Sequence, residues 1–191
     1  MSDRKETQDA QSAEALAVLN EADQLFTAAQ IDEAYDRLAA EIAARLKDQN
    51  PLVLCVMIGG MVPTVEILRR MEFPYEIDYL HATRYQGETA GREIIWKVSP
   101  TVRLTGRVVL VIDDILDEGH TLAAIQNAIR AQDVKALYTA VLVEKMHERR
   151  HPEARAEFVG VRVPDRYVFG GGMDYKNHLR FVPGLYAVKG M

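Results

Sequence analysis

The run LVLCVMI, from Leu52 to Ile58, limits what this chain can fold into more than any other segment. It is apolar at every position, and it is bounded by Pro51 on one side and by Gly59-Gly60 on the other. Such a run is typical of a strand in a sheet covered on both faces, because an exposed face would carry alternating polar residues. VVLVI, from Val108 to Ile112, is a second run of this kind. Both runs predict buried core strands.

Helical patterns alternate with the predicted strands. Apolar residues recur at helical spacing after Thr27, Thr27 and Gln30 form a capping box, and Asn50-Pro51 stops this helix. The other expected elements are a helix with Pro63 in its first turn and with Val65 and Leu68 facing inward, strands at Tyr75–Ala82, Ile94–Val98 and Leu137–Val143, and a helix from about Thr121 to Gln132. This alternation predicts an α/β fold, with a twisted, mostly parallel sheet flanked by helices.

The chain is long enough for one domain with a small additional lobe. Residues 1–14 are polar and predict a disordered leader, and residues 15–191 predict a single domain. From about residue 152 short apolar segments alternate with proline and glycine, so residues 152–191 and the N-terminal segment are expected to form a small hood over the sheet. The polar segment from Thr83 to Glu93 predicts a mobile loop between two strands.

Composition excludes several classes of function. The net charge is −5 and no long Lys/Arg tract is present, which argues against a nucleic-acid or membrane-surface partner. The single cysteine, Cys55, lies inside the LVLCVMI run, so disulfides and cysteine-based zinc sites are excluded. A polar N-terminus, and the absence of any run of about 18 apolar residues, predict a cytoplasmic protein.

Four carboxylates follow the Val108–Ile112 run directly: Asp113, Asp114, Asp117 and Glu118. In open α/β sheets ligands bind beyond the carboxyl ends of the strands, which is where this cluster is expected. Gly119-His120-Thr121 then leads into a helix, whose first N–H groups and dipole favour an anion. Carboxylates followed by an anion-binding turn suit a molecule with both hydroxyls and a phosphate, such as a sugar phosphate. Neither a Walker P-loop nor a GxGxxG fingerprint is present.

VVLVIDDILDEGHTL resembles the motif with which type I phosphoribosyltransferases bind 5-phosphoribosyl-1-pyrophosphate (PRPP). Other segments extend this resemblance to the hypoxanthine-guanine phosphoribosyltransferases, over roughly residues 15–188: CVMIGG, DYLHATRY, AVLVEK and PDRYVFGGGMDYKNHLR. The resemblance implies the type I phosphoribosyltransferase fold and a role in purine salvage. It implies the Mg²⁺-dependent transfer of the 5-phosphoribosyl group from PRPP to N9 of hypoxanthine or guanine, giving IMP or GMP and pyrophosphate.

The resemblance also implies roles for the acidic segment. Asp113 and Asp114 would bind the ribose hydroxyls and stabilise positive charge at C1 as pyrophosphate leaves. Asp117 would be the general base that takes the N7 proton of the purine, and crowding by the other carboxylates is expected to raise its pKa. The 5-phosphate would lie in the turn formed by Glu118, Gly119, His120 and Thr121.

Further residues are assigned by the same resemblance. Lys145 would donate to the purine O6, Tyr167 would stack on the base, and Val168 would offer its backbone to the purine edge. The pyrophosphate would meet Gly59, Gly60, Arg84, Tyr85 and Arg180. Asp174 would hold Mg²⁺, with Asp113 and Asp114 as further possible ligands. The family also implies a homodimer or homotetramer.

Two departures from the family keep alternatives open. Ile58 stands before the glycines where a lysine or another polar residue is frequent, and Arg84 replaces a frequent serine in the loop. A regulator of the same fold that binds PRPP or nucleotides without turnover is one alternative, and a phosphoribosyltransferase for xanthine or another base is a second. His147 and His151 are four residues apart, but Pro152 follows at once and no acidic ligand is near in sequence, so we expect solvated surface residues there rather than a zinc site.

Overall fold

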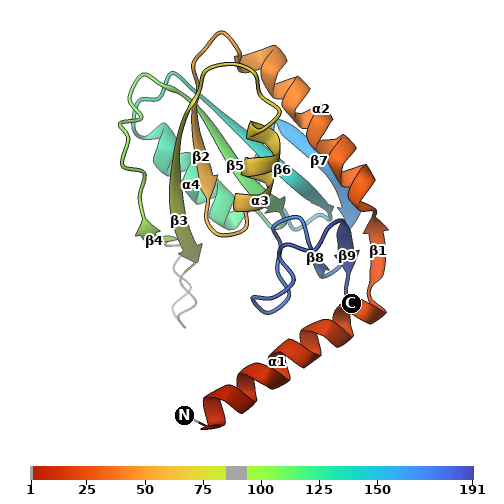
Figure 1. Cartoon of the computed structure of the whole chain (residues 1–191). Helices are drawn as coiled ribbons and strands as arrows, with labels where there is room; N and C mark the ends of the chain where they lie inside the picture. The colour runs from red at the N-terminus through yellow and green to blue at the C-terminus, as the bar shows by residue number, and fades with distance from the viewer. Residues whose placement is uncertain (1, 85–93) are drawn as a thin grey trace.

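The computed structural model describes residues 2–84 and 94–191, and the side chains within 9–83 and 95–191. In this part of the chain the central sheet has six strands, and Figure 1 shows it between helices. Its order is β4 (Ile94–Val98), β3 (Glu76–Arg84), β2 (Leu52–Val56), β5 (Val108–Leu116), β6 (Ala136–Met146) and β7 (Phe158–Pro164). The pairings are parallel except for β3 with β4. The predicted fold class is confirmed.

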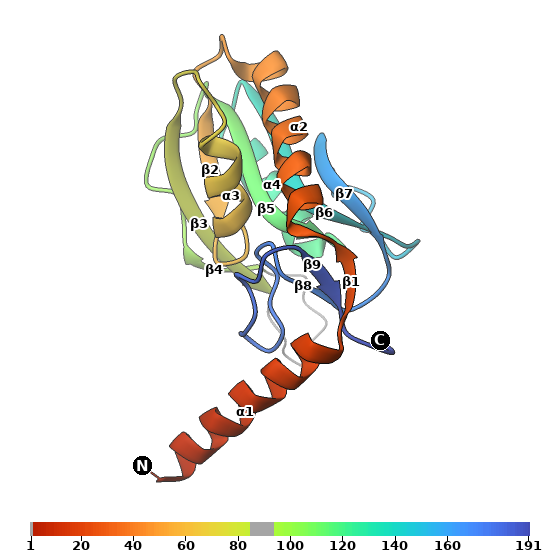
Figure 2. The same ribbon diagram turned by 45° about the vertical axis from the view of Figure 1, so that its right-hand side comes forward.

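Helices cover both faces of this sheet. The helices α2 (Ala28–Leu46) and α3 (Met61–Leu68) lie on one face, and α4 (His120–Arg130) lies on the other, as Figure 2 shows. Separate buried clusters fill the two sides, one joining α2 and α3 to the sheet and the other joining α4 to it. Because β2 contributes to both clusters, each of its residues is buried, which explains its continuous apolar run.

The start of α2 follows the predicted capping box. The Thr27 side chain accepts a hydrogen bond from the Gln30 backbone N–H, and the Gln30 side chain accepts one from the Thr27 backbone N–H at 2.9 Å. In α3 Pro63 lies in the first turn, as expected, and Leu68 is buried. Val65 is 61% exposed, so the prediction that it faces inward is wrong. The inward face of this short helix is formed instead by Thr64 and Ile67.

A second, smaller sheet lies beyond the carboxyl ends of the central strands (Figure 1). It contains β1 (Asp23–Phe26), β9 (Leu185–Ala187) and β8 (Val168–Phe169), paired antiparallel in that order. This sheet and the loops after Pro164 form the hood. The predicted start of the hood near residue 152 is wrong, because β7 pairs with β6 in the central sheet and buries Phe158, Val161 and Val163 there.

The predicted disordered leader is also corrected, because residues 2–21 form the helix α1 (Ser2–Glu21). A helix satisfies most of its own backbone hydrogen bonds, and this segment is rich in good helix formers. Its end is held by the hood: Ala15 is buried against hood residues, and Glu14 accepts hydrogen bonds from Tyr175 at 2.9 Å and Lys176 at 2.7 Å. Disorder was predicted from the low content of apolar residues in this segment, and composition carries no information about these contacts with the hood.

Other predicted boundaries shift by a few residues. The strand predicted to end at Ile112 continues to Leu116 in β5, so the first carboxylates lie within a strand rather than in a turn. Most of the predicted Thr83–Glu93 loop lies outside the described residues. Within the described ranges we find no helix that is both long enough and apolar enough to span a bilayer.

Candidate active site

The end of β5 carries the first two predicted site residues, Asp113 and Asp114. Burial raises the pKa of the Asp113 carboxyl well above its usual range, and the neighbouring Asp114 charge adds to this rise. Burial raises the pKa of Asp114 as well, although the hydrogen bond with Asp113 and the positive charge of Arg180 oppose it. Two adjoining carboxylates with raised pKa values form a site that favours bound cations or hydroxyl donors.

The turn after β5 leads into α4 as the sequence predicts. Gly119 has a φ of 76°, a left-handed conformation that glycine adopts without a steric cost, and it is the N-cap of α4. A pocket of about 300 Å³ joins this turn to the β5 carboxylates. It is lined by Asp113, Asp114, Ile115, Asp117, Glu118, Gly119, His120, Thr121 and Leu122. All the residues predicted for the ribose and the 5-phosphate therefore lie in one pocket.

A second pocket of about 260 Å³ adjoins the first. Its lining residues are Asp114, Ile115, Asp117, Lys145, Tyr167, Val168, Met173 and Asp174. Three of these, Asp114, Ile115 and Asp117, also line the pocket at the turn. The predicted purine residues come from β6 and the hood, and folding brings them next to Asp117. The arrangement places two pockets side by side, with Asp114 and Asp117 in the wall that they share.

Asp117 is engaged at both carboxylate oxygens. Lys145 Nζ donates to its Oδ2 at 2.7 Å, and His147 Nε2 lies 2.7 Å from its Oδ1. Burial by itself would raise the pKa of Asp117, but the hydrogen bonds from Lys145 and His147 outweigh burial and lower the pKa below its ordinary value. The predicted rise is therefore wrong, because the nearest groups are donors and cations rather than the other carboxylates.

Sequence reasoning missed His147, which it placed on the solvated surface. Its side chain is only 5% exposed and contacts Asp117. The missed signal was strand alternation: residues two apart on a strand point to the same side, and His147, directly after the last residue of β6, is two positions after Lys145. His151 meets the turn after β5 instead, with its ring 5.1 Å from that of His120.

Two of the predicted pyrophosphate residues, Gly59 and Arg180, lie against Asp114, which lines both pockets. A Cβ atom on Gly59 would overlap the Asp114 carboxylate, so a larger residue at that position would force this carboxylate to move. Arg180 donates to the Gly172 carbonyl at 2.5 Å and lies 3.9 Å from Asp114. Gly172 in turn touches the Gly59 backbone closely enough to exclude a side chain. The Arg84 side chain and Tyr85 lie outside the described residues.

These features are accompanied by a match to a protein family. The family model of the phosphoribosyl transferase domain matches residues 21–178. This chain belongs to the phosphoribosyltransferase family.

The phosphoribosyltransferase is similar to curated relatives along most of its length. It is 27% identical to a hypoxanthine-guanine-xanthine phosphoribosyltransferase of Tritrichomonas foetus over 165 residues, which covers 86% of this chain and 90% of that protein. A hypoxanthine-guanine phosphoribosyltransferase of Bacillus subtilis is 28% identical, covering 86% and 92%. The crystal structure of a hypoxanthine phosphoribosyltransferase from Staphylococcus aureus superposes with a TM-score of 0.82 at 25% identity, covering 87% of this chain and 91% of that one.

Two groups of side chains in the phosphoribosyltransferase offer ligand atoms that a metal ion could use. Asp113 and Asp114 fit a divalent cation, because burial raises the pKa of both carboxyls and a bound cation would compensate the negative charges that burial disfavours. Both Asp174 oxygens are engaged, one by Arg180 at 2.5 Å and the other by the Asn177 N–H at 2.7 Å.

The second group, formed by Asp117, His147 and Asp165, has ligand atoms within 4.8 Å of one another. The Lys145 ammonium already lies 2.7 Å from Asp117 and 3.9 Å from Asp165. A metal ion bound by this group would lie beside the positively charged Lys145 ammonium, which would repel it. The group is therefore better described as a charge network than as a metal site.

Proposed function

We propose that this phosphoribosyltransferase transfers the 5-phosphoribosyl group of PRPP to N9 of hypoxanthine or guanine, which makes it a purine-salvage enzyme. The observation that carries the proposal is the pair of adjoining pockets, which share Asp114, Ile115 and Asp117. One pocket has the carboxylates and the helix N-terminus that a ribose 5-phosphate needs. The other has Lys145 and an aromatic ring for a purine. Several of the similar proteins carry names for this reaction.

PRPP would be bound mainly by β5 and the turn that follows it. The 5-phosphate accepts hydrogen bonds from backbone N–H groups at the start of α4 and from the Thr121 hydroxyl. The ribose hydroxyls donate to Asp113 and Asp114, whose negative charge also stabilises the cationic character that develops at C1. Arg180 and the N–H groups of Gly59 and Gly60 bind the pyrophosphate.

The purine would bind in the second pocket. Lys145 donates to O6, Tyr167 stacks on the ring, and the Val168 backbone meets the purine edge. Adenine has an amino donor where hypoxanthine and guanine have O6, so it would leave the Lys145 ammonium without an acceptor. Asp117 takes the N7 proton while N9 attacks C1 and the C1–O bond to pyrophosphate breaks.

Mg²⁺ is the cofactor that this reaction implies. Asp113 and Asp114 would hold it, and Asp174 would join them only after Arg180 releases its carboxylate. The ion would neutralise charge on the departing pyrophosphate.

A regulator without turnover is the main competing function. Such a protein needs the PRPP pocket but not a general base or an O6 donor. The positions of Asp117 and Lys145, 2.7 Å apart in the second pocket, favour the enzyme. Ile58 is 48% exposed near the glycine loop, and its side chain offers no polar contact to pyrophosphate. Main-chain N–H groups of the glycines supply that contact in our proposal.

The deciding experiment incubates the protein with PRPP and Mg²⁺ and with hypoxanthine, guanine, xanthine, adenine or a pyrimidine in turn. We expect nucleotide and pyrophosphate with the first two bases and none with adenine. PRPP binding without product from any base would support the regulator instead. If only xanthine or only a pyrimidine gave product, the protein would carry out the same phosphoribosyl transfer on a different base.

We also propose that the protein forms a homodimer or homotetramer. Large apolar side chains are exposed on the β3 and β4 side of the sheet, namely Ile77 at 56%, Tyr79 at 47% and Ile95 at 44%. Val65 on α3 is exposed as well. Exposed apolar residues gathered in this way are typical of surfaces that a partner covers, and a second copy of the chain is the partner we propose. The cytoplasmic location expected from the sequence stays a prediction.

A further inference from the structure

We propose that His147 is a positioning residue, which holds the Asp117 carboxylate in place while Lys145 moves from Asp117 to the purine. This inference rests on the proposed function and adds to it a residue that the resemblance to the family does not assign. It concerns the second pocket, where the base is expected.

The hydrogen bonds of His147 determine which ring nitrogen carries the proton. Its Nδ1 accepts the backbone N–H of Arg149 at 3.1 Å, so Nδ1 has no proton in the neutral ring. The proton is therefore on Nε2, which donates to Asp117 Oδ1 at 2.7 Å. Because the side chain is 5% exposed, surrounding protein rather than water fixes the ring. His147 thus presents one oriented N–H donor to the carboxylate.

Lys145 is needed in two places during the reaction. Before the base binds, its ammonium donates to Asp117 Oδ2 at 2.7 Å. When the purine binds, the same ammonium is required at O6, and Oδ2 must be free to accept the N7 proton. At that moment Asp117 loses one of its two hydrogen-bond donors. A carboxylate that is free to change its rotamer would hold its accepting oxygen out of line with the N7 proton. The bond from His147 to Oδ1 remains through this exchange.

The proton balance of the step is simple. The N7 proton moves to Asp117 Oδ2 as the N9–C1 bond forms and the C1–O bond to pyrophosphate breaks. Asp117 becomes a neutral acid, and His147 keeps its Nε2 proton throughout. His147 therefore acts through Asp117 and does not touch the substrate, which distinguishes a positioning residue from a catalytic one.

Charged groups of both signs surround Asp117 and His147. Asp165 lies 3.9 Å from Lys145 and 2.8 Å from Arg149, and Arg149 is also 3.7 Å from Glu118. These groups come from β6, from the segments after β6 and β7, and from the turn after β5. Removing the His147 donor changes hydrogen bonding to Asp117 but leaves this balance of charges intact. The pKa of Asp117 should then rise, because one of the donors that lower it is lost.

The test compares His147→Leu with His147→Gln, whose side-chain amide offers an N–H near the place of Nε2. We expect His147→Leu to lower kcat about 10- to 100-fold with an unchanged KM for PRPP. The acid limb of the kcat/KM profile should move to higher pH, since the base must be ionised. His147→Gln should recover most of the activity, and His81→Leu, in the middle of β3, should behave as the wild type.

Two outcomes would overturn the proposal. One is a His147→Leu enzyme with wild-type kcat and pH profile. The other is a loss of kcat with an unmoved acid limb and no recovery in His147→Gln, since that pattern describes packing alone. If the wild-type protein turns over no base, the proposed function fails separately. A ¹³C NMR titration then tests the role of His147 without turnover, because the pKa of Asp117 should be higher in His147→Leu than in the wild type.

Discussion

Asp117 shows how neighbouring donors decide the chemistry of a single residue. With Lys145 on one oxygen and His147 on the other, its pKa is lowered, so the base stays ionised throughout the neutral range. Asp117→Asn should lower kcat by about 10²- to 10⁴-fold, because the amide cannot accept the N7 proton. PRPP affinity, measured by calorimetry without base, should stay close to that of the wild type. An unchanged kcat would remove Asp117 from the role of base.

Asp113 is expected to destabilise the ligand-free protein. Its folded-state pKa is raised above the unfolded value of about 3.9, so the folded state binds more protons than the unfolded state between these two values. Stability should therefore fall as pH rises from about 4 through the folded pKa, and then level off. Asp113→Asn removes the buried charge and should raise the Tm at pH 7 while lowering PRPP affinity. Thermal scans from pH 4 to pH 8 test this, and a lower Tm for the variant at pH 7 would contradict it.

At the scale of elements, α2 depends on its capping box. Thr27→Ala removes the side-chain acceptor for the Gln30 N–H and should lower the free energy of unfolding by about 0.5 to 2 kcal/mol. Urea denaturation measures this change, and kcat should be unaffected because Thr27 lines neither of the two pockets. The exposed Thr105→Ala is the matched control and should change stability little. Equal effects of both substitutions would show that the cap contributes nothing.

β5 is the element whose end was hardest to predict. Its apolar half was clear from the sequence, but the strand continues through Asp113 and Asp114 to Leu116. Pairing with β6 holds the backbone of this polar half, as Asp113 pairs with Val141 and Leu116 with Glu144. Propensity disfavours aspartate in strands, and pairing with a long neighbouring strand overrides that preference. The two aspartates are therefore held by the sheet rather than by a flexible turn.

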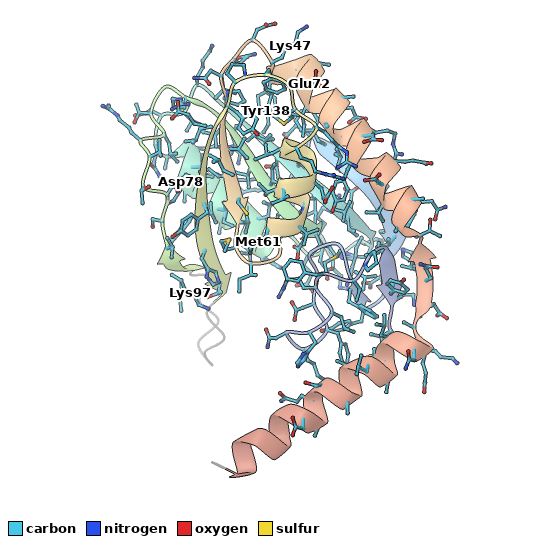
Figure 3. All side chains as sticks on the ribbon, in the orientation of Figure 1. Lys47, Met61, Glu72, Asp78, Lys97 and Tyr138 are labelled. Carbon is cyan, nitrogen blue, oxygen red and sulfur yellow. The ribbon has the colours of Figure 1, made fainter. Side chains whose placement is uncertain are left out.

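At the scale of the whole molecule, the exposed apolar side of the sheet predicts self-association. Light scattering after gel filtration should give the mass of a dimer or tetramer for the wild type. Ile77→Lys with Tyr79→Glu should shift the protein towards the monomer, because charged groups would be buried without partners. Lys47→Glu is the control, because exposed Lys47 stands at the C-terminal end of α2, which packs on β6 and β7, and Figure 3 shows it at the end of the molecule remote from the hood. A wild-type protein that elutes as a monomer at all concentrations would exclude this proposal.

The sequence by itself determined the fold class, the PRPP-type motif and the polar residues that line the two pockets. These follow from local properties: apolar runs indicate core strands, and the glycine at 119 permits the left-handed turn that opens α4. Only the tertiary structure decided that α1 packs against the hood, that β7 joins the central sheet, and that the pKa of Asp117 is lowered. The partners of Asp117 are 28 and 30 residues away in the chain, on the neighbouring strand β6 and just beyond it. Contacts over such distances depend on strand order and register, and no local pattern around Asp117 encodes them.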